Sequence, residues 1–416
     1  MNILIKNIIF NGKKQDIFVE GNKIKKISRN LNLKAKEKID GKGVKAVLPG
    51  LINCHTHAAM SLLRGFADDL PLKEWWENKI LPQEAKLTEE DIYWGTKLAI
   101  LEMIKTGTTY FNDMYWEQEA SIEAVEEMGI GAKIGLIIID FVSWGKREQV
   151  ENNWSNFQRR KFKTTTLSIA PHTIYTVSKE NLVWAKNFAQ KNNLILHIHV
   201  SETEKEVKDC QKKWKVRPVE YLEKIGFLGD NVVLAHGVWL SEKEIKILSK
   251  RKCSVVYNPC SNLKLVSGTM PYSKLKENRV NVCLGTDGPA SNNNLDMFEE
   301  MKVGALIQKH QTKDPIVAPA RELLDSATID GARALKLNAG KIQVGKLADL
   351  ILVDLNNTLF LPGHNFISDV VYSASGLTVT DSICNGQILM RDRKVKDERK
   401  IFKKTTIIAK NLINRK

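Results

Sequence analysis

The residues in this sequence with the clearest chemical potential are histidines. His55 and His57 stand two positions apart in VLPGLINCHTH. On a β-strand this spacing points both imidazoles to the same face, so both can reach one ion. Neutral imidazole is a good ligand for zinc or iron. An HxH pair alone is often incidental, so it predicts a metal site only together with further ligands.

Further candidate ligands lie at the ends of other apolar runs. His199 ends LILHIHV, and Asp287 follows VNVCLGT, where an unpaired buried carboxylate would be costly. His197 shares the face of His199, and we interpret it as a hydrogen-bonded core residue because His199 lies nearer the end of its run. His236 ends VVLAH and supplies a fourth imidazole. Together these residues predict a metal with an open position for water, and therefore a hydrolase.

The elements that carry these residues alternate in type. Eight apolar runs have the length and composition of buried strands: the run at His55, then TTYFND, AKIGLIII, TLSIAPH, LILHIHV, VVLAHGV, CSVVYNP and VNVCLGTD. Amphipathic helical stretches such as 89–107, 179–193 and 294–310 separate them. The pattern predicts an α/β fold with a parallel (β/α)₈ barrel, whose chemistry lies at the carboxyl ends of the strands.

The residue pattern at both ends of the chain differs from that of the predicted barrel. Residues 1–48 alternate apolar and polar positions between Asn-Gly turns, and β character returns after residue 340. We expect residues 1–48 and 341–416 to form one small β-sandwich domain and residues 49–340 to form the catalytic barrel.

Composition narrows the class of protein. The chain has 416 residues, and its six cysteines form no CxxC pair, which predicts reduced thiols and argues against a zinc ribbon. No apolar run reaches the length of about 18 residues that a membrane span needs, and the first residues lack the features of a secretory signal. We expect a cytoplasmic protein without a membrane partner.

The net charge of +15 raises the question of a polyanionic partner. The lysines are spread along the whole chain and mixed with glutamates, which is typical of a solvated surface. We therefore expect no nucleic-acid partner. A basic nucleic-acid-binding protein on a retired enzyme scaffold is the competing interpretation, and it predicts strongly salt-dependent binding without a metal.

The sequence resembles the amidohydrolase superfamily, in particular the 5-methylthioadenosine/S-adenosylhomocysteine deaminases and their 5'-deoxyadenosine deaminase relatives. The resemblance runs from residue 1 to about residue 395 and rests on these motifs: PGLINCHTHAAMSLLRG, ADDLPLKEWWENKILPQEAKLT, KTGTTYFNDMY, PHTIYTVS, HIHVSET, NPCSNLKLVSG and LGTDGPASNNNLDMFEEMK. It implies a distorted barrel with a β-sandwich built from both chain ends, and homo-oligomers, either dimers or tetramers.

The resemblance also implies a role for each site residue. One divalent ion, with zinc first and iron or manganese as alternatives, would bind His55, His57, His199 and Asp287. Glu202 would contact the purine edge and deliver a proton to N1, and His236 with Asp287 would activate the water. His172 would bind the purine ring, and Glu84 the ribose hydroxyls. TLSIAPH has no lysine that could bridge a second metal.

Two departures concern the pocket. HTIYT, with Thr173 and Ile174, replaces the usual HAPYT or HSPYT. Some relatives hold the carboxylate of homocysteine with two arginines; Arg147 matches one of them, and the other position falls in IGLIIID, which has no arginine. This favours a substrate with a small 5' substituent.

The predicted function is hydrolytic deamination of an adenine nucleoside to the inosine analogue and ammonia. The candidate substrates are 5-methylthioadenosine, 5'-deoxyadenosine, adenosine and S-adenosylhomocysteine. A related hydrolase acting on guanine, cytosine or a triazine would share the metal residues but would lack a ribose-binding carboxylate. Its local motif, LPQEAKLT, is typical of the start of a helix, so without the resemblance the motif favours a solvated helix carboxylate for Glu84.

Overall fold

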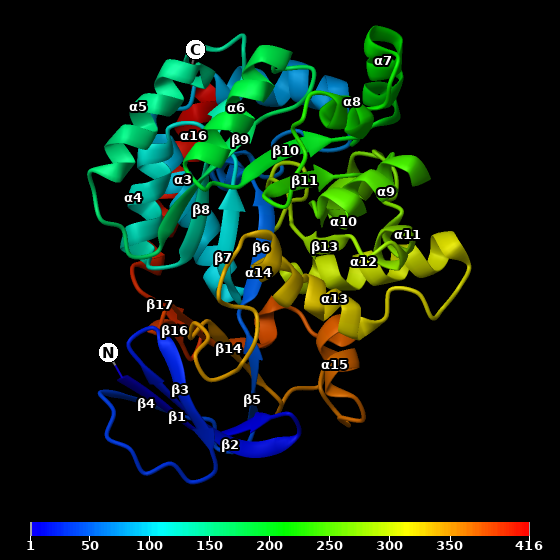
Figure 1. The fold of residues 1–416 in the computed structure, drawn as a ribbon. Coiled ribbons are helices and arrows are strands. Elements are labelled where there is room, and N and C mark those ends of the chain that lie inside the picture. Colours follow the sequence, from blue (N-terminus) through cyan, green and yellow to red (C-terminus); the bar gives the residue numbers. More distant parts are fainter. Residues whose placement is uncertain (1, 416) are drawn as a thin grey trace.

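The computed structural model describes residues 2–415 and contains two sheets (Figure 1). The larger sheet is parallel, with eight strands that neighbour one another in chain order. These strands are β6 (Leu51–Thr56), β7 (Thr108–Asp113), β8 (Gly131–Ile138), β9 (Thr165–Pro171), β10 (Leu196–Val200), β11 (Val232–His236), β12 (Ser254–Tyr257) and β13 (Asn281–Leu284).

The first and last strands of this sheet approach each other and nearly close it into a barrel. The backbone N–H of Asp287, just after β13, donates to the carbonyl of His55 in β6 at 3.0 Å. The Asn53 amide donates to the Thr286 hydroxyl at 2.7 Å across the same seam. The eight strands predicted from the apolar runs are therefore confirmed, and the closure brings two candidate ligands together.

Helices connect the barrel strands and cover their outer face (Figure 1). The main ones are α3 (Glu89–Lys105), α4 (Gln118–Met128), α5 (Arg147–Gln158), α6 (Lys179–Lys191), α7 (Glu204–Trp214), α8 (Pro218–Lys224), α9 (Glu242–Arg251), α10 (Pro259–Lys264), α11 (Tyr272–Glu277), α12 (Met297–Thr312), α13 (Ala320–Ser326) and α14 (Ile329–Ala334).

The second sheet takes strands from both ends of the chain, as predicted. Its order is β17-β16-β15-β14-β5-β1-β2-β3, with β4 paired to β1. The bounds are β1 (Asn2–Phe10), β2 (Lys13–Glu20), β3 (Lys23–Ser28), β4 (Glu37–Asp40), β5 (Lys45–Pro49), β14 (Leu350–Asp354), β15 (Val379–Cys384), β16 (Gln387–Arg391) and β17 (Lys394–Val395). The expected domain boundaries after residues 48 and 340 stay a prediction.

The helix α16 (Glu398–Asn414) packs on the barrel helix α3. Its apolar side chains Ile401 and Leu412 are fully buried, and Arg415 forms an ion pair with Asp91 at 2.6 Å. No helix within residues 2–415 is long and apolar enough to cross a membrane.

The long segment between β6 and α3 folds over the carboxyl end of the barrel. It contains η1 (Ala58–Leu63), α1 (Leu72–Glu74), a π-helical turn η2 (Trp75–Ile80) and α2 (Leu81–Glu84). This segment places Trp76 and Glu84 at the wall of a cavity of about 770 Å³.

Candidate metal centre and active site

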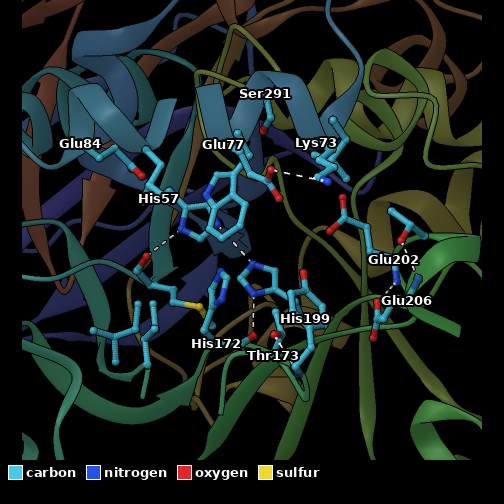
Figure 2. A pocket seen from close by; sticks show the side chains of 18 of the residues that line it. His57, Lys73, Glu77, Glu84, His172, Thr173, His199, Glu202, Glu206 and Ser291 are labelled. Carbon is cyan, nitrogen blue, oxygen red and sulfur yellow. Dashed lines mark hydrogen bonds and ion pairs between the residues drawn. The ribbon is translucent and has the colours of Figure 1, made fainter. Parts of the chain in front are cut away.

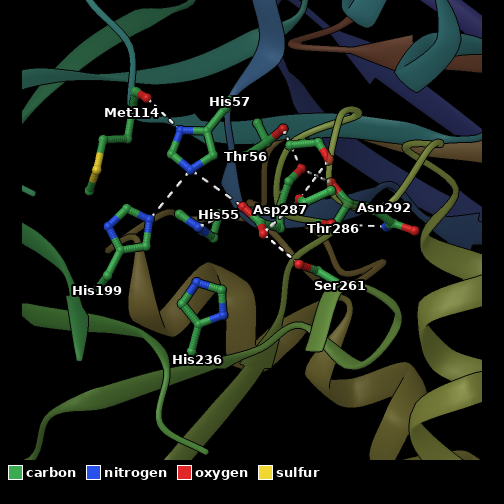
Figure 3. A network of polar contacts seen from close by, with 12 residues as sticks. His55, Thr56, His57, Met114, His199, His236, Ser261, Thr286, Asp287 and Asn292 are labelled. Atoms are coloured by element: carbon green, nitrogen blue, oxygen red, sulfur yellow. Dashed lines mark hydrogen bonds and ion pairs between the residues drawn. The ribbon is translucent and has the colours of Figure 1, made fainter. Parts of the chain in front are cut away.

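The candidate metal ligands gather at the carboxyl ends of four barrel strands (Figure 3). His55 lies in β6 and His57 directly follows it, His199 lies in β10, His236 ends β11, and Asp287 follows β13. His236 and Asp287 adopt left-handed backbone conformations, with φ of 72° and 61°. Such conformations carry strain and cluster at functional sites, here where the chain turns its side chains into the barrel mouth.

Two of the imidazoles are oriented by backbone carbonyls. The Nδ1–H of His57 donates to the Met114 carbonyl at 2.7 Å, and that of His199 donates to the His172 carbonyl at 2.9 Å. A neutral imidazole carries one proton, so both rings keep a free lone pair on Nε2. These two Nε2 atoms lie 3.4 Å apart. Histidines that bind a metal typically donate their other ring N–H to a carbonyl or carboxylate in this way, which fixes the tautomer and the orientation of the ring.

The third imidazole is oriented by another histidine. Nδ1 of His55 lies 3.1 Å from Nε2 of His197, and both rings are fully buried. Nε2 of His55 is also buried and makes no hydrogen bond of good geometry, although Oδ1 of Asp287 lies 3.2 Å away. A buried polar atom without a well-aligned partner is costly, and this one faces the gap between the other candidate ligands. His197 supports His55, as expected of a core histidine.

Asp287 completes the group from the opposite side. Its Oδ1 lies 3.2 Å from Nε2 of His55 and 3.3 Å from Nε2 of His57. Its Oδ2 accepts hydrogen bonds from the hydroxyls of Ser261 at 2.6 Å and Ser291 at 2.8 Å (Figure 3). Burial opposes ionisation of this carboxyl, but the bonds to His55 and His57 hold its pKa well below the usual range.

These residues fit a divalent cation. The ligand atoms of His55, His57 and His199 lie within 4.8 Å of one another, as do those of His55, His236 and Asp287. Burial lowers the pKa of His57, but the bond to Asp287 outweighs this effect and raises the pKa to about 9, so without a cation Asp287 holds a proton on Nε2 of His57. A bound cation would take the place of this proton, and the imidazole and carboxylate donors of the centre suit zinc or iron.

His236 and Glu202 face each other beside this centre. The Nε2 of His236 lies 3.7 Å from Oε2 of Glu202. The Asn262 amide donates to Nδ1 of His236 at 2.9 Å, so the proton of the neutral ring sits on Nε2. His236 can therefore donate a hydrogen bond to an oxygen between itself and the metal ligands.

The loop that carries Glu202 is held by a buried carboxyl group that the sequence analysis missed. The two oxygens of Glu206 accept hydrogen bonds from the backbone N–H groups of Ser201 at 2.8 Å and Glu202 at 2.9 Å. Burial raises the pKa of Glu206 to about 8. Its place in SETEKE, one helical turn after Glu202, is the sequence signal that could have identified it.

A cavity of about 770 Å³ opens from the metal centre (Figure 2). Glu84 lies in its wall, only 5% exposed, and its carboxylate accepts a hydrogen bond from the Tyr115 hydroxyl at 2.7 Å. Burial raises the pKa of Glu84 to about 7. Glu84 is thus no solvated helix carboxylate.

The predicted residue His172 and the ring of Trp76 also line the cavity. Trp76 stacks on the ring of His172, with ring centroids 6.2 Å apart and planes 26° apart. Nδ1 of His172 bonds the Thr176 hydroxyl at 3.0 Å. Burial lowers the pKa of His172 to about 3, so its ring is neutral and can hydrogen-bond a heterocycle.

The structure does not bring Arg147 to this cavity. Arg147 begins α5, donates to the side chain of Asn181, and lies over the ring of Trp184 with its guanidinium carbon 5.7 Å from the centroid. The side chain turns toward α6 because both partners lie on that helix. At the expected second arginine position the apolar side chains of Ile137 and Ile139 face the cavity.

Comparison with known proteins shows to which family this chain belongs. Residues 46–389 match the model of the Amidohydrolase family. The chain is 46% identical over 388 residues to the 5'-deoxyadenosine deaminase of Methanosphaera stadtmanae. This alignment covers 92% of this chain and 91% of that protein. It is 46% identical over 402 residues to the 5-methylthioadenosine/S-adenosylhomocysteine deaminase of Thermococcus sibiricus, covering 94% of each.

Solved structures agree as well. An adenosine deaminase from Xanthomonas campestris with bound zinc superposes with a TM-score of 0.93 at 32% identity, covering 100% of this chain and 98% of that one. The zinc complex of an atrazine chlorohydrolase from Arthrobacter aurescens superposes with a TM-score of 0.90 at 21% identity, which shows a shared fold. This chain belongs to the amidohydrolase family and is an aminohydrolase enzyme.

Proposed function

We propose that this enzyme removes the 6-amino group of an adenine nucleoside with a small apolar 5' group, such as 5'-deoxyadenosine or 5-methylthioadenosine. The observation that carries the proposal is the buried carboxylate of Glu84 in the wall of the cavity that ends at the metal centre. A buried carboxylate is suited to accept hydrogen bonds from the two ribose hydroxyls. A ring hydrolase without a sugar in its substrate has no use for it.

The 5' end of the substrate would lie against an apolar wall. Trp116 and Trp144 stack with ring centroids 4.9 Å apart, and Ile137 and Ile139 pack beside them. Two of the lysines at the cavity have carboxylate partners, Lys73 with Glu77 and Lys205 with Asp209, and Lys213 lies over the ring of Trp214. A methyl or methylthio group suits the apolar wall, whereas the carboxylate of S-adenosylhomocysteine would meet no arginine among the residues that line the cavity.

Zinc is the ion we propose. His55, His57, His199 and Asp287 would hold it, and a bound zinc ion acidifies water and acts as a Lewis acid.

The side chains around the centre would handle the protons. A water oxygen adds to C6 of the purine while Asp287 takes one of its protons and Glu202 places a proton on N1. His236 donates its Nε2–H to the oxygen that gains negative charge. The bond from C6 to the amino nitrogen then breaks as Asp287 passes its proton to that nitrogen, which leaves as ammonia. The hydroxyl proton on C6 passes to Glu202 while the C6 carbonyl forms, which restores both carboxyl groups. Glu84, His172 and Trp76 would hold the nucleoside without joining the chemistry.

The test is a substrate panel with enzyme that has been stripped of metal and reloaded with zinc. Adenosine, 5'-deoxyadenosine, 5-methylthioadenosine and S-adenosylhomocysteine are followed by the loss of absorbance near the adenine maximum. We expect the highest kcat/KM for 5'-deoxyadenosine and 5-methylthioadenosine, and the lowest for S-adenosylhomocysteine. Turnover of none of the four would overturn the proposal, and faster turnover of guanine, cytosine or a triazine would favour the competing function.

Glu84→Gln tests the ribose contact in the same assay. A hydrogen bond to a charged group is worth about 1.5–3 kcal/mol, so kcat/KM on the preferred nucleoside should fall roughly 10- to 100-fold. Glu74→Gln, an exposed glutamate of the same segment, is the matched control. Unchanged kcat/KM in Glu84→Gln would count against the nucleoside assignment.

A further inference from the structure

A buried lysine lies at the opposite end of the barrel from the metal centre. Lys133 is the third residue of β8, and the residue is only 9% exposed. Its ammonium donates to the Thr166 hydroxyl at 3.1 Å, and no aspartate or glutamate among residues 2–415 forms an ion pair with it. Burying an ammonium without a counter-charge is unfavourable, and burial lowers the pKa of Lys133 to about 8.

This ammonium faces a second cavity, of about 350 Å³. The volume lies within the range of roughly 300–1,000 Å³ that is usual for small-molecule sites. The cavity is lined by apolar side chains from several elements around Lys133 and Thr166, among them Trp154, Phe157, Leu194 and Leu335. The proposed deamination uses none of these residues.

A second lysine stands at the same cavity. Lys336 follows α14 and lines the cavity, and its repulsion adds to the lowered pKa of Lys133. Lys336 itself has a partner, since its ammonium lies 3.8 Å from a carboxylate oxygen of Asp230. One positive charge therefore remains without a counter-charge in this cavity.

We propose that this cavity is a binding site for a small organic monoanion, a carboxylate on a flat apolar body. The carboxylate would pair with the Lys133 ammonium, with Lys336 as a second contact at the rim. The body would lie against the rings of Trp154 and Phe157 and the leucines beside them. A single uncompensated charge matches a monoanion better than a phosphate, which carries more charge and has no apolar surface to bury.

The test uses benzoate as probe, with benzyl alcohol and inorganic phosphate as comparisons, and calorimetry on the intact enzyme. We expect benzoate to bind with one site that Lys133→Met weakens at least tenfold. The exposed Lys34→Met is the matched control and should bind like the unmodified enzyme. Absence of benzoate binding, equal binding by Lys133→Met, or equal binding of benzyl alcohol or phosphate would overturn the proposal.

A second measurement does not depend on a variant that folds. Lysines of the unmodified enzyme are acetylated with a water-soluble reagent, and the labelled peptides are quantified by mass spectrometry. Benzoate should slow the labelling of Lys133 and Lys336 at least threefold and leave that of Lys34 unchanged, whereas benzyl alcohol should protect none of them. Equal labelling of Lys133 with and without benzoate would also contradict the site.

Discussion

At the scale of single residues, the metal centre depends on which nitrogen or oxygen atom of each ligand side chain is left without a hydrogen bond. Backbone carbonyls occupy Nδ1 of His57 and His199, so their Nε2 atoms face the centre. The serine hydroxyls occupy one oxygen of Asp287, so the other oxygen faces His55 and His57. The supporting groups decide the direction of each ligand, which the ligand types alone leave open.

Removing the serine support should weaken the metal site. Ser261→Ala leaves Asp287 with one hydroxyl donor, and the loss of such a supporting contact typically costs about 10- to 100-fold in metal affinity. Competition with a chromogenic chelator measures this affinity directly. Ser155→Ala, at an exposed position of α5, is the control and should bind zinc normally. Equal zinc affinity in the two variants would show that the hydroxyl is not needed.

Glu84 should make stability depend on pH. Its pKa is about 7 in the folded protein against a usual value of 4.5. Between these values the folded state binds more protons than the unfolded state, so stability falls as pH rises through this window. Glu84→Gln removes the titration. It should therefore raise the free energy of unfolding relative to the unmodified enzyme by about 3 kcal/mol at pH 8 and by less than about 1 kcal/mol at pH 5.

Thermal unfolding of the metal-free proteins at both pH values measures this difference. The same shift of the melting temperature at pH 5 and pH 8 would contradict a buried, titrating Glu84. The exposed Glu74→Gln should change neither value, because its carboxyl group stays in water in both states.

At the scale of elements, the loop after β10 joins the metal centre to Glu202, the proposed proton donor. The side chain of His199, near the end of β10, points into the metal centre. The chain then turns so that Glu202 faces His236. Glu206, in the first turn of α7, ties this turn down through two backbone N–H groups. Glu206 is thus a positioning residue for Glu202.

Glu206→Ala should lower kcat far more than it raises KM. Without the two hydrogen bonds to Glu206, the loop would no longer hold Glu202 in place in the transition state. A misplacement of about 1 Å can cost on the order of 100-fold in rate. Glu206→Gln keeps one acceptor and should recover part of the activity, while the exposed Glu204→Ala on the same helix should stay active. Steady-state kinetics with bound zinc quantified separates this effect from metal loss. A change confined to KM would contradict the positioning role.

At the scale of the whole molecule, α16 attaches the last described part of the chain to the barrel. Leu412 is fully buried in this contact, and its neighbour Ile413 is 53% exposed. Packing against α3 also brings Arg415 to Asp91, the residue that caps α3 by accepting from the backbone N–H of Thr88 at 2.8 Å. Stability of the barrel is therefore coupled to this helix.

Leu412→Ala should destabilise the protein, and Ile413→Ala should not. A buried leucine truncated to alanine costs about 2–5 kcal/mol, whereas changes at exposed positions stay within about 0.5 kcal/mol. Urea unfolding of both variants gives the comparison. Equal midpoints would mean that α16 is not packed as described.

The expected dimer or tetramer and the cytoplasmic location stay predictions.

The sequence by itself determined the types of ligand, their order on the strands and the class of fold. Apolar runs of strand length alternate with amphipathic helices, and His55, His57, His199, His236 and Asp287 stand at the ends of those runs. Parallel strands in a barrel must bring such ends to one rim. That is a rule of local pattern and topology, so no coordinates were needed to apply it.

Only the tertiary structure decided which groups orient the metal-binding side chains through hydrogen bonds. It also decided that the predicted residue Arg147 does not line the cavity. The carbonyl that orients His57 belongs to Met114, directly after β7, and Ser261, which donates to Asp287, lies in α10. Arg147 turns to α6 instead of the cavity. Such contacts join residues far apart in the chain, and their existence depends on side-chain directions that periodicity does not specify.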